Sequence, residues 1–166
     1  MTLKIDNAIN LLESIIADPS KGLPEEVFQF ISRVTPLVNV DLLIKDENNR
    51  TVLTWRDDDC YKSGWHIPGG VIRYKEDTTA RIMAVAAKEL GAGVSFIKNP
   101  LLVSEIFLPI KNRAHAISLL YECKLLTALD EARRFEEGSP KPGQWAWHNK
   151  CPDNLIDVHD IYRKFI

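Results

Sequence analysis

The sequence predicts an α/β (α+β) domain in which a mixed β-sheet lies between helices. Segments with strand-like and helix-like apolar patterns intermix along the chain, but they do not alternate regularly as in a doubly wound parallel sheet. A glycine pair at 69–70 follows a proline and separates an aromatic-rich strand from a helix. With 166 residues and no linker or repeat, the chain is expected to form one such domain, preceded by an extra N-terminal helix.

Two helices are predicted before the first strand. The first has an apolar face with helical spacing and ends at Pro19. Its apolar face consists of Ile5, Ile9, Leu12, Ile15 and Ile16. The second begins at Pro24 and stops before Pro36. We therefore divide the chain into an N-terminal helical extension over 1–22 and a domain over 23–166.

A β-hairpin is expected at the start of the domain. Residues 37–44 read LVNVDLLI, a run that favours a strand. The turn at 46–49 then returns the chain into a second strand over 51–55, so that the two strands pair. A polar loop over 56–64 leads on to a short strand over 65–67.

The glycine pair Gly69-Gly70 leads into the next helix. Asp77 or Thr78 can accept a hydrogen bond from the first turn, and Gly91 permits the left-handed conformation that often ends a helix. The predicted core face of this helix consists of Ile82, Ala86 and Leu90.

The second half of the domain supplies more strands and a last helix. Apolar and β-branched residues predict strands over 101–108 and 116–125, and a further strand over 144–148. Between them, 127–137 is expected to form a short exposed helix, and 157–166 a final amphipathic one.

Composition excludes several classes of function. The net charge is −2 with interspersed signs, so no basic surface indicates a nucleic-acid partner. The N-terminal segment mixes charged and apolar residues, so it predicts neither a signal peptide nor a membrane span. Cys60, Cys123 and Cys151 have neither the density of a disulfide framework nor zinc-ligand spacing. We therefore expect a cytoplasmic protein with reduced thiols, and no nucleic-acid or membrane partner.

The glycine pair and the helix after it carry the chemical signal. Glycines let the backbone approach a diphosphate, and carboxylates on one helix face can hold a hard divalent cation. The spacing of Gly70, Glu76 and Leu90-Gly91 fits the frame G-x5-E-x7-R-E-U-x-E-E-x-G-U, where U is a bulky apolar residue. Over this segment the chain resembles the Nudix hydrolases.

Several charged residues of the frame are replaced in this chain, and the pattern of replacement resembles one branch of the Nudix hydrolases. Residues 84–89 read AVAAKE, which puts Ala84 at the arginine, Val85 at the first glutamate and Lys88 at the first member of the glutamate pair. Only Glu89 remains. The GDP-mannose mannosyl hydrolases also keep only this last glutamate, and the chain resembles that branch after residue 22.

Other segments are similar to the same branch. Residues 23–44 look like its N-terminal helix followed by an STPLVSLDF-type strand, and WHIPGG over 65–70 is similar to its WFVPGG. Ala114-His115 is similar to the T-T-H that starts one of its strands, and WAW over 145–147 stands where it has Y-R-W.

This resemblance implies an unusual reaction. Water attacks the anomeric carbon of a nucleoside diphosphate sugar, and sugar and nucleoside diphosphate are released. It implies one Mg²⁺, which Mn²⁺ can replace, to stabilise the leaving diphosphate, and a protein base that deprotonates the water. It also implies a homodimer.

Carried over position by position, the resemblance assigns site residues. Gly69 offers its carbonyl and Glu89 its carboxylate to the metal. Arg56 supports the leaving diphosphate, and His115, a pocket histidine, is the candidate base. The implied substrate-binding residues are Asp41, Arg56, Gly70, Lys88 and Trp145.

Further departures leave alternatives open. The branch's remaining metal ligand and its base fall on Lys141 and Pro142, and Val71 stands at another of its arginines. Glu136, Glu137 or Gln144 are candidate replacements for the metal ligand. The alternative functions are a catalytically silent domain that binds a nucleotide or nucleotide sugar, and conventional phosphoanhydride cleavage.

Several polar and aromatic residues have two interpretations. Lys88 and Arg81 share a helix face and either are solvated or bind phosphate directly. Asp41 in an apolar run costs free energy unless it is paired, with Arg56 as one candidate partner, or faces a cavity. Trp145 shares a strand face with Trp147, and that face packs in the core or lines a pocket. His66 can take either face of its strand, whereas the remaining histidines, His148 and His159, are expected at the surface.

Overall fold

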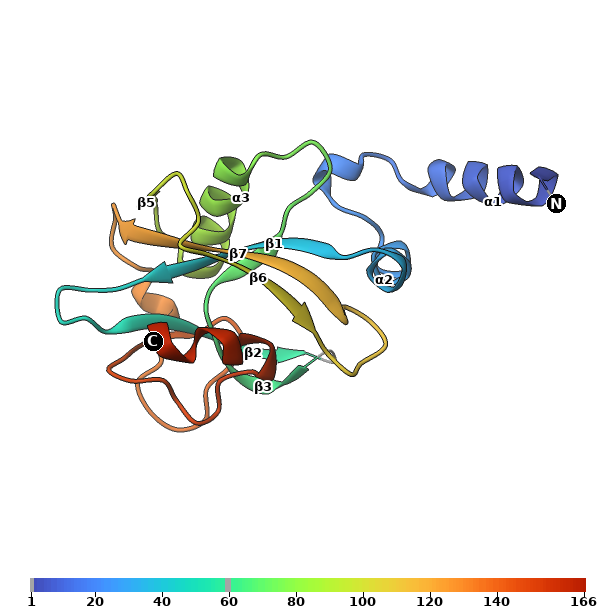
Figure 1. Ribbon diagram of the computed structural model, residues 1–166. Helices are drawn as coiled ribbons and strands as arrows, with labels where there is room; N and C mark the ends of the chain where they lie inside the picture. The colour runs from blue at the N-terminus through green and yellow to red at the C-terminus, as the bar shows by residue number, and fades with distance from the viewer. Residues whose placement is uncertain (1, 59–60) are drawn as a thin grey trace.

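The computed structural model describes residues 2–58 and 61–166, which form two β-sheets with helices around them (Figure 1). The larger sheet is mixed: its order is β4-β1-β7-β5, β6 also pairs with β7, and β1 runs parallel to β7. Its strands are β1 (Leu37–Ile44), β4 (Gly69–Val71), β5 (Val94–Phe96), β6 (Leu102–Phe107) and β7 (His115–Leu125). The smaller sheet is antiparallel, in the order β3-β2-β8. Its strands are β2 (Thr51–Asp58), β3 (Tyr61–His66) and β8 (Trp145–His148).

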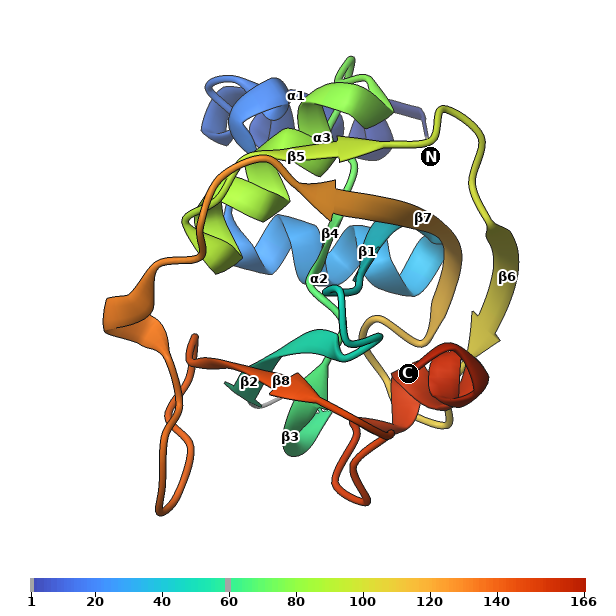
Figure 2. The same ribbon diagram turned by 90° about the vertical axis from the view of Figure 1, so that its left-hand side faces the viewer.

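Helices lie on both sides of the mixed sheet, which confirms the predicted fold class (Figure 2). Helix α3 packs on one face, and the small sheet with the C-terminal 3₁₀ helix covers the other. The α-helices are α1 (Thr2–Ile15), α2 (Glu25–Val34) and α3 (Thr78–Val85), and α3 continues as a π-helical turn, η2 (Ala86–Leu90). The 3₁₀ helices are η1 (Pro19–Lys21), η3 (Glu131–Arg133) and η4 (Asp157–Phe165).

Local sequence signals account for the position of α3. The Asp77 side chain accepts a hydrogen bond of 2.7 Å from the Ala80 N–H, which satisfies a donor of the first turn. Gly91 ends the helical segment with φ of 64°. The predicted core residues Ile82, Ala86 and Leu90 are fully buried, so this helix is confirmed in its cap, stop and face.

The predicted hairpin between 37–44 and 51–55 is wrong. β1 and β2 belong to different sheets, and a single bridge between Lys45 and Thr51 joins them. β7 pairs with β1 along its whole length, and β4 pairs with the opposite edge. Because both edges of β1 are occupied, β2 pairs with β3 and β8 instead.

Other expected boundaries also change. The predicted loop over 56–64 is largely strand, because β2 extends to Asp58 and pairs with β3 through a β-bulge. The expected helix over 127–137 is one 3₁₀ turn. Of the cysteines, Cys123 and Cys151 are free thiols, and Cys60 lies outside the described residues.

The N-terminal extension forms the predicted helix, but its apolar face stays uncovered. In Figure 1, α1 projects away from the sheets, and Ile5 and Ile9 are 52% and 47% exposed. The division between 1–22 and 23–166 stays a prediction. Among the described residues, no helix combines the length and apolarity needed to cross a bilayer.

Candidate active site

Buried and half-buried polar side chains gather where the chain passes from β3 of the small sheet into β4 of the mixed sheet. They come from β1, β2, β3, β7, η2 and η4. We call this group the polar cluster; its members are Asp41, Thr54, His66, Glu89, Ser118, His159 and Tyr162.

Glu89, in the π-helical turn after α3, points into the polar cluster. Its Oε2 accepts a hydrogen bond of 2.8 Å from the Thr54 hydroxyl and lies 3.2 Å from His66 Nε2. Its Oε1 accepts from the Gly69 N–H at 3.3 Å. Burial alone would raise the pKa of Glu89, but His66, Thr54 and the Gly69 amide together hold that pKa below its usual value. Glu89 is therefore ionised at neutral pH.

Asp41 is the second carboxyl group of the polar cluster. Its Oδ2 accepts hydrogen bonds from the Ser118 hydroxyl and, at 2.8 Å, from the Tyr162 hydroxyl. Its Oδ1 lies 3.9 Å from His159 Nε2. Burial raises the pKa of Asp41 to about 6, and the two hydrogen bonds only partly oppose this effect. Asp41, a polar residue in the apolar strand β1, is thus held by hydrogen bonds.

His159 was expected at the surface, and this prediction is wrong: it is 7% exposed. Because η4 is a 3₁₀ helix with three residues per turn, His159 and Tyr162 share its buried face. The His159 Nδ1 accepts a hydrogen bond of 3.0 Å from the Ile67 N–H. Burial is the main cause that places the pKa of His159 well below its usual value, so the ring is neutral.

We expect Asp41→Asn to stabilise the protein more at pH 8 than at pH 4.5. The folded-state pKa of Asp41 is raised, so its favourable contribution is present below the unfolded pKa near 3.8 and is lost as the pH rises through about 6. With about 1.4 kcal/mol per pKa unit, the variant should gain about 2 kcal/mol of unfolding free energy between these conditions relative to the parent.

Urea unfolding of both proteins at the two pH values measures this difference. The pH dependence that His159 adds is present in both proteins and cancels. The same substitution at exposed Asp153 should leave the difference between the two pH values unchanged. A gain that is equal at both pH values would contradict the raised pKa of Asp41.

Two further predicted residues lie at the polar cluster. Gly69 is the register partner of Asp41, and a Cβ at position 69 would lie 2.0 Å from Asp41 Oδ1. Arg56 lies in β2 with its guanidinium 5.0 Å from the Tyr61 ring centroid. Arg56 is two residues from Thr54 in β2, so the two side chains leave the same face of this strand.

His115 and Trp145 do not join the polar cluster. His115 stacks on Phe107 at the beginning of β7, five residues before Leu120, which pairs with Asp41. Side chains alternate between the two faces of a strand, so His115 lies on the face of β7 opposite to Leu120 and to Ser118 of the polar cluster. Trp145 is buried in the core, and its indole N–H donates to the Asp130 carbonyl at 2.8 Å.

The cations of α3 and η2, Arg81 and Lys88, have different environments. The Arg81 guanidinium contacts Glu76 Oε2 at 2.6 and 2.8 Å, so Arg81 pairs with the frame's first glutamate. This contact opposes the interpretation of Arg81 as a phosphate ligand. Lys88 is exposed to solvent, and Gly70 lies against Val85, whose Cγ2 would be 3.0 Å from a Cβ at position 70.

The residues of the polar cluster do not fit a resident Mg²⁺ site. Magnesium in proteins prefers octahedral oxygen ligation by carboxylates, water and phosphate. Val85 and Lys88 replace two carboxylates of the frame, and both Glu89 oxygens already contact protein donors. Within residues 2–58 and 61–166, no three His, Cys, Asp or Glu side chains converge as metal ligands. Mg²⁺ stays a prediction of the resemblance.

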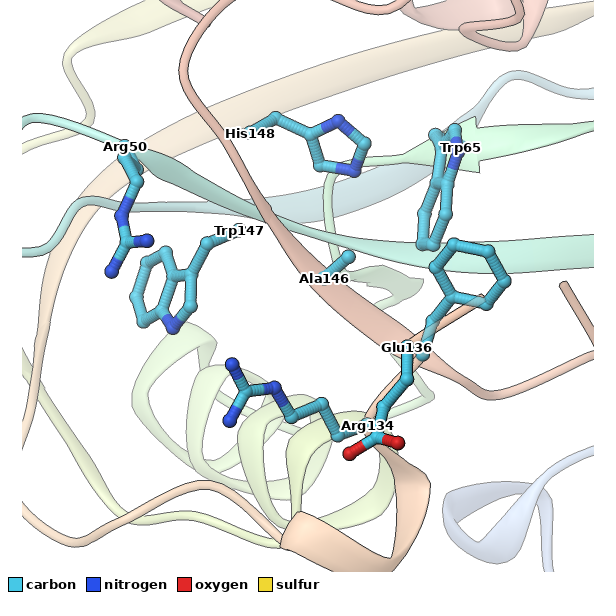
Figure 3. A pocket seen from close by; sticks show the side chains of 8 residues that line it. Arg50, Trp65, Arg134, Glu136, Ala146, Trp147 and His148 are labelled. Carbon is cyan, nitrogen blue, oxygen red and sulfur yellow. The ribbon is translucent and has the colours of Figure 1, made fainter. Parts of the chain in front are cut away.

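A separate pocket of about 330 Å³ lies at the outer edge of β8 (Figure 3). Figure 3 shows Arg50 and Trp147 on one side of it and His148 and Trp65 on the other. Glu136, one candidate metal ligand, lines this pocket and not the polar cluster. Gln144, another candidate, accepts a hydrogen bond of 2.8 Å from the Lys141 N–H.

The match to curated proteins covers part of the chain, and no protein-family model matches it. A segment of 77 residues is 32% identical to the low-salt glycan biosynthesis protein Agl8 of Haloferax volcanii. This segment is 46% of the present chain and 49% of Agl8. The chain therefore spans about half the length of the curated relative that it matches.

Solved structures resemble the chain over most of its length. The MutT protein of Methanosarcina mazei Go1 superposes with a TM-score of 0.59 at 16% identity, covering 79% of this chain and 91% of that one. A MutT Nudix hydrolase of Burkholderia pseudomallei gives 0.56 at 17% identity, over 80% and 98%. A UDP-X diphosphatase gives 0.56 at 18% identity, over 98% and 88%. The chain has the fold of the Nudix hydrolases.

Proposed function

We propose that the protein hydrolyses a nucleoside diphosphate sugar of the GDP-mannose kind between the sugar and the diphosphate. The polar cluster is the observation that carries this proposal. An ionised Glu89 lies against His66 beside the Gly69-Gly70 turn, and Asp41, the register partner of Gly69, supplies a second carboxyl group. A core without a function would not gain from burying so many polar groups at one place.

Each substrate group has a candidate partner. Arg56 shares a face of β2 with Thr54 of the polar cluster, and its guanidinium is a candidate partner for the diphosphate. Asp41 can accept a hydrogen bond from a sugar hydroxyl through Oδ1, because its two strong donors both bind Oδ2. The names of Agl8, a glycan biosynthesis protein, and of UDP-X diphosphatase support a nucleotide-linked sugar as the substrate class.

A catalytically silent domain that binds such a nucleotide is the second candidate. The observation that favours it is the loss of the frame's carboxylates: position 85 is a valine packed in the core, and position 88 is an exposed lysine. Binding through Arg56 and the glycine turn would survive these replacements, whereas a rate enhancement that depends on a carboxylate would not.

Product analysis distinguishes the candidates. The protein is incubated with a panel of nucleoside diphosphate sugars in Mg²⁺, in Mn²⁺ and in EDTA, and the products are separated by chromatography. We expect free sugar and nucleoside diphosphate. Sugar phosphate with nucleoside monophosphate would indicate phosphoanhydride cleavage, and calorimetric binding without turnover would indicate the silent domain.

We further propose a cytoplasmic homodimer. The apolar face of α1 is exposed in the single chain, and a short helix gains most of its stability from packing of such a face. The free thiols of Cys123 and Cys151 support a reducing compartment. Light scattering of the full chain and of a variant with Ile5 and Ile9 changed to serine measures the contribution of α1 to pairing.

A further inference from the structure

The hydrogen bonds around His66 fix which ring nitrogen carries the proton. The Thr54 hydroxyl donates its only hydrogen to Glu89, so its oxygen can only accept from His66 Nε2, 3.2 Å away. Glu89 Oε2, also 3.2 Å from that nitrogen, is an acceptor as well. With acceptors on both sides, Nε2 must carry the hydrogen, and the neutral ring has its lone pair on Nδ1.

The Nδ1 of His66 is buried and has no hydrogen-bond partner among the described residues. The whole side chain is 10% exposed, so bulk solvent does not satisfy this nitrogen. Buried polar atoms are nearly always paired, and an orphaned one marks a place where a ligand or a water molecule can bind. The lone pair therefore lies on a buried nitrogen without a protein partner among the described residues, on a ring whose Nε2 is held by Thr54 and Glu89 of the polar cluster.

None of the other three histidines offers such a lone pair at the polar cluster. His159 Nδ1 already accepts from the Ile67 N–H. His115 lies at the far end of β7, and His148 packs edge-on against Trp65 at the separate pocket. Among the histidines of this chain, only His66 combines the position with an available nitrogen.

We infer that His66 is the general base of the proposed hydrolysis and that Glu89 positions it, instead of serving as a ligand of a resident metal. This inference rests on the proposed function. The oxygen of a water molecule forms a bond to the anomeric carbon, and the bond from that carbon to the diphosphate oxygen breaks with its electron pair on the diphosphate. The proton of the water passes to Nδ1. The resulting imidazolium faces the carboxylate of Glu89, as in other histidine–carboxylate pairs.

Substitution of His66 tests this assignment. In His66→Gln the amide N–H can still donate to Glu89, but no basic nitrogen remains. We expect kcat to fall by about 10²-fold to 10⁴-fold, while KM and the calorimetric Kd for the nucleotide sugar change by less than about threefold. His148→Gln is the matched control, since it makes the same change at another partly buried histidine, and its kcat should match the parent. Thermal unfolding of both variants checks that each is folded.

The role of Glu89 is tested by a double-mutant cycle with His66 and by a measurement of metal binding. Because the two residues act as a unit, the double variant with Glu89→Gln should be scarcely slower than His66→Gln alone. Mn²⁺ titrations followed by electron paramagnetic resonance, without nucleotide, should be the same for the parent and Glu89→Gln. Binding of Mn²⁺ that disappears in Glu89→Gln overturns the positioning role, and a His66→Gln enzyme with parental kcat overturns the base.

The failures of the two proposals are distinguishable. If the parent and His66→Gln hydrolyse the substrate equally fast, only the inference about His66 is overturned. A parent that turns over no nucleoside diphosphate sugar in any metal condition overturns the proposed function, and the base with it.

Discussion

Gly69→Ala is expected to destabilise the protein by roughly 3 kcal/mol and to abolish activity. A Cβ at this position would lie 2.0 Å from Asp41 Oδ1 and 3.0 Å from the Val40 carbonyl oxygen. Neither atom can easily move, because Asp41 is held by its hydrogen bonds and Val40 belongs to the pairing of β1 with β4. Urea unfolding, with the fit constrained to a common slope, measures the loss.

Gly93→Ala is the control for this change. The nearest heavy atom to a Cβ at position 93 is 3.9 Å away, in Thr127. We expect a change of less than about 0.5 kcal/mol there. Adding Asp41→Ala to Gly69→Ala should recover part of the lost stability, because it removes the closest clash. If Gly69→Ala were as stable as Gly93→Ala, Asp41 would not lie against position 69.

Val85→Glu, which restores a carboxylate of the Nudix frame, should destabilise the protein by roughly 3 kcal/mol. Val85 is 4% exposed and packs in the core cluster formed by α3 and the mixed sheet. The nearby guanidinium of Arg81 is already paired with Glu76, so the new carboxylate would lose its hydration without gaining an uncommitted cation. The free energy of unfolding at pH 8 checks this expectation.

Lys88→Glu restores the other missing carboxylate and is the matched comparison. Lys88 is exposed, so its replacement should change stability by less than about 0.5 kcal/mol. If Val85→Glu were as stable as Lys88→Glu, the site would have room and polarity for the carboxylate, and the core packing of position 85 would be refuted.

The features of the fold that depend on neighbouring residues in the sequence were predicted correctly. The cap at Asp77, the stop at Gly91 and the buried face of α3 are all present, because each depends on residues within one or two helical turns. The pairing of β1 with β2 was predicted wrongly. These strands are close in sequence with a turn between them, but β1 pairs with β4 and β7 instead.

The candidate site was predictable only in part for the same reason. Gly69 and Glu89 were found from the spacing of a single motif, and Asp41 from its place in an apolar run. His66 had no such signal, since it meets Thr54 only through the register of β3 with β2. His159 was misplaced because its hydrogen bond with the Ile67 N–H joins segments that are far apart in the sequence.

The sequence by itself determined the frame of the site: a glycine turn, a capped helix and one surviving glutamate at the end of that helix. The tertiary structure alone decided which groups surround this glutamate. A carboxylate binds whichever donors lie within about 3 Å, and those donors arrive from β2, β3 and the glycine turn through long-range strand pairing and packing. Residue spacing specifies positions along one helix or strand, but it does not specify which segments are brought together.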